Sequence, residues 1–160
     1  MASKTDTHPI LVPIDFSENS EIALLQAAEL AEALKAKLVV LHVVHDLSQA
    51  PGFYAEKVKK KQLRRMEDIA AEMLQEFMAD IHKKHDKLAA LQSVDTLLVV
   101  GIPVTRILET AGKLHARMIV MGSQGRTGLS HILLGSKAEQ VVRLAKIPVM
   151  IVKKPGKKQH

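Results

Sequence analysis

Residues 118–136 read MIVMGSQGRTGLSHILLGS, and this stretch decides the fold class. Its first four residues, Met118–Met121, form a short apolar run of the kind that fills a buried strand. A loop containing glycines follows from Gly122 to Gly135, and Ser136–Ala145 has the apolar spacing of a helix. A buried strand that leads through a loop into a helix is typical of an α/β sheet.

The same alternation of strand and helix continues on both sides of this stretch. Further strands are predicted at Ile10–Ile14, Lys37–Val44, Thr96–Val100 and Val149–Val152. Further helices are predicted at Ser20–Leu34, Ala55–Lys87 and Val104–Leu114, the first capped by Ser17 or Asn19. Because parallel strands need crossover connections, the pattern predicts a doubly wound open sheet of five parallel strands with four helices.

Length and composition predict one domain, which we assign to residues 9–153, with flexible termini at 1–8 and 154–160. The chain has 160 residues, 47% of them hydrophobic, which is enough for one core. It has no apolar run of the roughly 18 residues that a membrane span needs, and Met1–His8 lacks the apolar centre of a secretory signal. We therefore expect a cytoplasmic protein. The absence of cysteine excludes disulfides and thiolate chemistry.

The positive charge is local. The net charge of +6 comes largely from Lys57–Arg65 and Lys153–Lys158. Nucleic-acid binding is not expected, because base stacking normally uses aromatic side chains and the chain has no Trp, one Tyr and three Phe. We interpret Lys57–Arg65 as a solvated helix face, and binding of a partner or an anionic membrane remains the alternative.

The loop after Met121 carries the chemistry. Gly122 and Gly125 allow the backbone to approach a ligand closely, and Gly135-Ser136 places free amides and a hydroxyl at a helix start, where anions bind. Glycines that serve only to turn the chain are the alternative. The spacing fits neither the G-x-x-x-x-G-K-[ST] phosphate loop nor the dinucleotide G-x-G-x-x-G pattern. It is instead G-x2-G-x9-G-[ST].

That gapped pattern resembles the ATP-binding signature of the universal stress protein family. Other matching segments are Val12–Ser17, Leu41-His42-Val43, Gly101-Ile102-Pro103 and Pro148–Val152, and the resemblance covers Ile10–Val152. It implies an adenine nucleotide alpha hydrolase-like, Rossmann-like fold, a homodimer, an unidentified protein partner in a stress response, and bound ATP, or ADP or AMP, with Mg or Mn.

The resemblance also implies roles for individual residues. Pro13, Ile14 and Asp15 would enclose the nucleoside, with Asp15 near the ribose hydroxyls, and the Val43 backbone would recognise the adenine edge. Met121 and Gly122 would lie under the ribose. The residues expected around the phosphates are Gly125, Arg126, Gly135, Ser136, Lys137 and Ala138. Asp15 is the one oxygen ligand expected near the loop, and it could help to bind a nucleotide-bound Mg. A single carboxylate is too few to predict a metal site formed by the protein itself.

Several polar residues are interpreted as structural, or as insufficient for fast catalysis. His82 and His85 could form a metal pair, but a solvated helix end is the preferred interpretation, and His42 is treated as structural. The loop offers Gln124, Arg126, Lys137 and His131 but no carboxylate base, so ATP hydrolysis is expected to be slow or absent.

Alternative functions stay open at this point. An ATP-using hydrolase or ligase of similar fold would normally carry a Ser-Gly-Gly-x-Asp-Ser-type loop after the first strand, where this chain has Asp15–Ser20. An electron-transfer flavoprotein subunit would be yellow when purified.

We also expect the homodimer to form through Val149–Val152, since this apolar strand would otherwise leave an open sheet edge.

Overall fold

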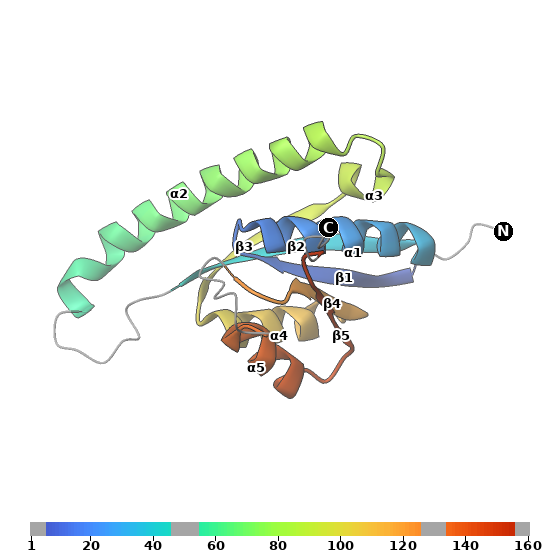
Figure 1. Cartoon of the computed structure of the whole chain (residues 1–160). Helices are drawn as coiled ribbons and strands as arrows, with labels where there is room; N and C mark the ends of the chain where they lie inside the picture. The colour runs from blue at the N-terminus through green and yellow to red at the C-terminus, as the bar shows by residue number, and fades with distance from the viewer. Residues whose placement is uncertain (1–5, 46–54, 126–133, 156–160) are drawn as a thin grey trace, which may run out of the picture.

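The computed structural model describes residues 6–45, 55–125 and 134–155, with side chains described from His8, Arg64 and Leu134 onward in these ranges. Its centre is one sheet of five parallel strands in the order β3-β2-β1-β4-β5 (Figure 1). The strands are β1 (Asp6–Ile14), β2 (Ala36–His45), β3 (Asp95–Gly101), β4 (Met118–Gly122) and β5 (Val149–Val152). The predicted doubly wound parallel sheet is confirmed.

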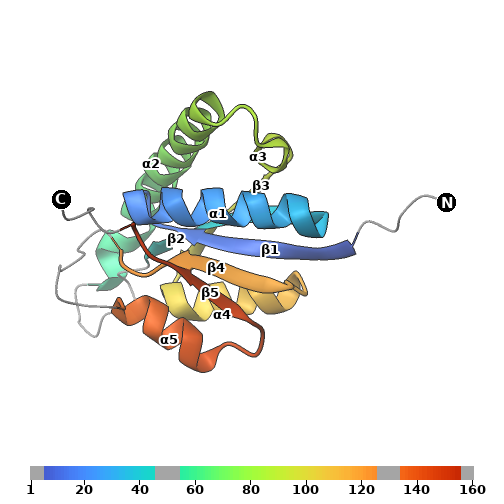
Figure 2. The same cartoon turned by 45° about the vertical axis from the view of Figure 1, so that its right-hand side comes forward.

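Helices cover both faces of the sheet. α1 (Glu18–Leu34), α2 (Ala55–Lys84) and α3 (Ala89–Gln92) lie on one face, and α4 (Pro103–Lys113) and α5 (Ser136–Leu144) on the other (Figures 1 and 2). Successive residues of a strand point to opposite faces. Ile10 and Val12 of β1 accordingly pack in the core under α1, whereas Leu11 packs in the core over α4 and α5. This explains why the strands read as continuous apolar runs.

The strand order reverses between β1 and β4. The chain passes from β1 outward to β2 and β3, then returns to the other side of β1 for β4 and β5. The connections that leave β1 and β4 therefore diverge to opposite faces, which opens a crevice at the carboxyl ends of these strands. The segments with the predicted binding residues meet at this point.

The start of α1 is fixed at that crevice. Ser17 is the N-cap, and its hydroxyl accepts a hydrogen bond from the Ser20 amide at 3.2 Å. Glu18 and Glu21 in the first turn favour the positive end of the helix dipole. Of the two predicted caps, Ser17 is thus the one used.

The end of α2 differs from the prediction. The helix stops at Lys84 instead of Lys87, and α3 is a fifth helix that the sequence did not indicate. The reason lies in tertiary contacts: Leu91 of α3 is fully buried, and the His82 Nε2 donates to the Leu91 carbonyl at 2.6 Å. His85 lies 3.8 Å from Glu21 of α1. The two histidines therefore make separate contacts, His82 with α3 and His85 with α1.

One further boundary differs from expectation. β1 begins at Asp6, so it includes Thr7 and His8, which we had assigned to a flexible terminus; Asp6 pairs with Ala36 of β2. In the described part of the chain, no helix is both long and apolar enough to cross a membrane.

Candidate functional site

A cavity of about 520 Å³ opens at the carboxyl ends of β1, β2 and β4. Cavities that bind small molecules commonly measure about 300–1,000 Å³. Its walls come from the β1–α1 turn, the end of β2, the middle of α2, the start of α4, and the segments that flank the glycine loop. Eleven of the twelve predicted binding residues line it, while Arg126, like His131, lies outside the described residues. The eleven are Pro13, Ile14, Asp15, Val43, Met121, Gly122, Gly125, Gly135, Ser136, Lys137 and Ala138.

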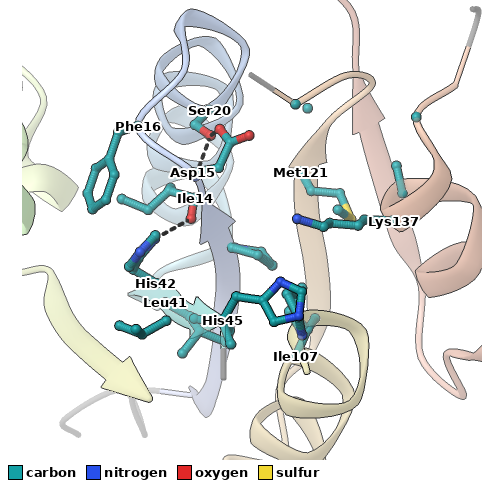
Figure 3. A pocket seen from close by; sticks show the side chains of 18 of the residues that line it. Ile14, Asp15, Phe16, Ser20, Leu41, His42, His45, Ile107, Met121 and Lys137 are labelled. Atoms are coloured by element: carbon teal, nitrogen blue, oxygen red, sulfur yellow. Dashed lines mark hydrogen bonds between the residues drawn. The ribbon is translucent and has the colours of Figure 1, made fainter. Parts of the chain in front are cut away.

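Asp15 is held by the start of α1. Its Oδ1 accepts hydrogen bonds from the Ser20 hydroxyl at 2.6 Å and from the Ser17 amide at 3.1 Å (Figure 3). The Asp15 amide in turn donates to the Ser20 hydroxyl at 2.9 Å, and Ser20 is buried. With Oδ1 fixed, Oδ2 faces the glycine loop, since a Cβ atom placed on Gly125 would lie 2.8 Å from it. The site therefore presents a carboxylate in one orientation.

The three glycines of the motif have different surroundings. A Cβ on Gly122 would lie 2.9 Å from the backbone oxygen of Asn19, so this glycine lets β4 pack against the first turn of α1. Gly125 makes room for the Asp15 carboxylate. The Gly135 amide donates to the Ser123 carbonyl at 2.7 Å, which brings the end of the loop back to its beginning. Among the described glycines, only Gly101 has a positive φ, so close approach, not backbone conformation, accounts for the described glycines of the motif.

The N-terminus of α5 forms the polar wall opposite Asp15. Its N-cap, Gly135, has no side chain to bind the first amides of the helix. These amides and the helix dipole favour an anion. Lys137 is exposed and extends into the cavity, beside Met121 (Figure 3). The wall can therefore neutralise negative charge through both amides and an ammonium group.

The part of the cavity near the end of β2 is apolar, and one edge of β2 there is not paired with β1. Pairing of β2 with β1 ends at His42, whereas pairing with β3 continues to His45. From Val43 onward, the β1 side of β2 therefore faces the cavity. Leu41, Ile107 and Met121 supply apolar surface there. A flat heterocycle that needs backbone hydrogen bonds along one edge fits such a slot.

A family model described as the universal stress protein family matches residues 7–153. The chain belongs to this family. Universal stress protein MJ0531 of Methanocaldococcus jannaschii is 37% identical over 150 residues, which cover 92% of this chain and 83% of that protein. The solved structure of MJ0577, from the same organism, is 31% identical with a TM-score of 0.71, covering 94% of this chain and 99% of that one. A universal stress protein from Archaeoglobus fulgidus, solved in complex with dAMP, is 27% identical with a TM-score of 0.61, covering 91% and 98%.

This universal stress protein also brings to the cavity residues for which the sequence predicted no ligand role, including His42, which we had interpreted as structural. Phe16 and His42 lie beside Asp15, and the exposed His45 points into the cavity from the end of β2 (Figure 3). His45 follows Val43 by two positions, so strand alternation could have identified it. Four residues of α2 form a further wall: Met66, Ile69, Ala70 and Met73. Apolar residues at helical spacing are visible in this part of the sequence, but such spacing indicates only that a helix packs with one face on the core.

A metal ion finds few ligands in this universal stress protein. Among the described residues, no three His, Cys, Asp or Glu side chains are grouped so that they could hold one. Among the described residues that line the cavity, Asp15 alone supplies a carboxylate. Mg²⁺ is commonly held by one or two carboxylates together with substrate phosphates. The described residues therefore fit a metal that arrives with a nucleotide better than a metal centre held by side chains alone.

Proposed function

We propose that this universal stress protein binds ATP, as its Mg or Mn complex, and acts as a nucleotide-dependent regulatory homodimer in a stress response in the cytoplasm. ADP and AMP are the related ligands expected at the same site. One observation carries the proposal: a single cavity joins a fixed carboxylate, an open strand edge between apolar walls, and an uncapped helix N-terminus with a lysine. These features match the ribose, the base and the phosphates of a nucleotide, respectively.

The base would occupy the slot beside Val43. Adenine offers a donor and acceptors along one edge, which suit the backbone groups of an unpaired strand edge. Ile107 and Met121 would contact its faces. The dAMP complex of the Archaeoglobus fulgidus relative supports an adenine ligand for this family member.

The ribose and phosphates would follow toward α5. The ionised Asp15 side chain is an acceptor only, so it is suited to two ribose hydroxyls. Gly125, Gly135, Ser136, Lys137 and Ala138 would surround the phosphates, with the amides of α5 as donors. Asp15 would be the carboxylate that could help to hold a nucleotide-bound Mg or Mn, and the ion would screen the charge of the phosphates. Arg126 belongs to this proposal from the sequence alone.

The output would be transmitted through β5. This strand is an edge of the sheet with four partly buried apolar residues, Val149–Val152, and pairing with a second copy would cover it. The Ser123 amide donates to the Val152 carbonyl at 3.0 Å, so the start of the glycine loop is bound to the same strand. Nucleotide occupancy would thereby alter the edge that a second chain or a protein partner meets.

Calorimetry on a charge-matched pair of variants tests the site. Micromolar binding corresponds to about 8 kcal/mol, and a hydrogen bond to a charged group contributes about 1.5–3 kcal/mol. Lys137→Met should therefore raise the dissociation constant for Mg-ATP about tenfold or more. Lys146→Met removes the same charge from an exposed residue just before the amino end of β5, whereas the cavity lies at the carboxyl ends of the strands, and this variant should bind like the parent. Equal affinity in all three proteins would remove α5 from the site.

A further inference from the structure

Phe16, the residue after Asp15, has an unusual backbone conformation. Its φ is +64°, in the left-handed region that bulky residues rarely adopt. Among the described residues, Lys35 and His115 are the other non-glycine residues with positive φ, and each follows the end of a helix, where this conformation is common. Phe16 instead precedes a helix, so capping does not explain it. Strained conformations of this kind are often found at ligand sites.

His42 contacts the chain on both sides of Asp15. Its Nδ1 lies 2.9 Å from the Ile14 carbonyl oxygen, and because a carbonyl only accepts, Nδ1 carries the proton and donates. The imidazole also stacks on the Phe16 ring, with centroids 4.3 Å apart and planes inclined by 36° (Figure 3). Phe77 of α2 meets the Phe16 ring edge-on at 5.8 Å. The residues before and after Asp15 are thus both held by one side chain.

We infer that His42 and Phe16 act as positioning residues that aim Asp15 at the ribose hydroxyls of the nucleotide and so set selectivity for the ribose diol. This inference rests on the proposed function. The φ of Phe16 determines where the chain leaves Asp15, and the hydrogen bonds to Ser17 and Ser20 hold Oδ1. His42 opposes relaxation of the strained turn from both directions. The orientation of Oδ2 toward the cavity then depends on a side chain that does not itself touch the diol.

The alternative is that the three rings simply fill space beneath α2. Two observations favour the positioning role. Phe16 and His42 both line the cavity and are only partly buried, so the cluster is not sealed in the core. A packing role also gives no reason for the positive φ of Phe16, since an unstrained turn could place a ring in the same core.

The test compares ATP with 2′,3′-dideoxy-ATP, which lacks both hydroxyls, by calorimetry on the full chain. The parent should bind ATP about tenfold more tightly, the factor expected for hydrogen bonds to a charged group. His42→Phe keeps an aromatic ring against Phe16 but removes the donor to Ile14. It should weaken ATP binding to the level of the dideoxy analogue and leave the analogue unchanged. His42→Asn, which retains a donor, should recover part of the preference.

The control is His82→Phe. It removes the same type of hydrogen bond, from an imidazole to a backbone carbonyl, at a residue near the C-terminus of α2 that does not line the cavity. The ratio of the two affinities should stay at the parent value. Phe16→Gly provides a second variant that should fold, because glycine adopts positive φ without strain, and it should also lose the preference.

Three results would overturn the inference. If His42→Phe or Phe16→Gly weakens both ligands equally and the ratio persists, the rings act only in packing. If the parent binds both ligands equally well, Asp15 does not read the diol and there is nothing for His42 to aim. If the parent binds neither ligand, the proposed function itself is wrong, which distinguishes that failure from the other two.

Discussion

Adding one methyl group at each of three glycines separates what the glycines do. Gly112 lies on the exposed face of α4, and a Cβ there has no other atom within 4 Å. A Cβ at Gly122 would lie 2.9 Å from the Asn19 oxygen and 3.1 Å from the Asn19 carbonyl carbon. At Gly125 the one described residue that it would approach is Asp15, whose carboxylate would lie 2.8 Å away. The added methyl group therefore meets open space at Gly112, rigid backbone at Gly122 and a ligand-facing side chain at Gly125.

The expected changes in stability follow from these distances. Carbon contacts are comfortable at about 3.5–4.0 Å, so Gly122→Ala forces β4 and α1 apart by several tenths of an ångström. Overpacking of this kind costs about 1–3 kcal/mol of unfolding free energy. Gly112→Ala should instead stabilise by about 0.5–1 kcal/mol, since it lowers the backbone entropy of the unfolded chain. Gly125→Ala should change stability by no more than about 0.5 kcal/mol.

Urea unfolding and ATP titration together give the assay. With a slope of about 1–3 kcal/mol per molar urea, the midpoint for Gly122→Ala should fall by roughly 1 M, while Gly112→Ala should raise it. Gly125→Ala should unfold like the parent but bind ATP about tenfold more weakly, because its methyl group displaces the Asp15 carboxylate. The reasoning fails if Gly122→Ala is as stable as the parent while Gly112→Ala shows its gain. It fails equally if Gly125→Ala keeps full affinity.

Two further predictions concern assembly and turnover. Met150→Lys and Ile151→Lys each place a charge on the β5 edge. Light scattering should find these variants as monomers, whereas the parent should be a dimer. Variants that remain dimeric would show that the interface lies elsewhere. Phosphate release at saturating Mg-ATP should stay below about 1 s⁻¹, the low end of ordinary enzyme rates, because Asp15 is the one carboxylate among the described residues that line the cavity and its Oδ1 is already bound. A faster rate that disappears in Gln124→Ala would make this protein an ATPase.

The sequence predicted the sheet because its strands carry their own signal. Ile10–Ile14 is apolar on both faces, which suits a strand covered by helices on both sides, and the alternating helical patterns left a parallel sheet as the consistent arrangement. The end of α2 carried no such signal. It depends on the burial of Leu91 and on the hydrogen bond from His82, which form only when α3 folds back onto the core. A four-residue helix is too short to show a period.

The site was predicted in outline for a similar reason. The spacing of Gly122, Gly125 and Gly135 indicated a loop that must come close to something, and strand order indicated where. What each glycine approaches could not be read from the sequence, because Asn19 and Asp15 reach the loop from a distant segment. The positive φ of Phe16 is likewise not visible in the sequence, and the rings that its side chain contacts, those of His42 and Phe77, come from distant segments. Local sequence gave no reason to expect a left-handed phenylalanine.

Ser123 connects the proposed ligand site to the proposed dimer edge. It is buried, its carbonyl accepts from Gly135 at the far end of the glycine loop, and its amide donates to Val152 at the end of β5. A phosphate that draws Gly135 and α5 toward itself would therefore act on β5 through one residue. Linkage requires the effect to be reciprocal: if ATP tightens the β5 pairing by some factor, pairing must tighten ATP binding by the same factor. The ATP affinity of the Met150→Lys variant should then differ from that of the parent by a certain factor. ATP should change the dimerisation constant of the parent by the same factor. This is expected although Met150 is a residue of the edge strand and does not line the cavity.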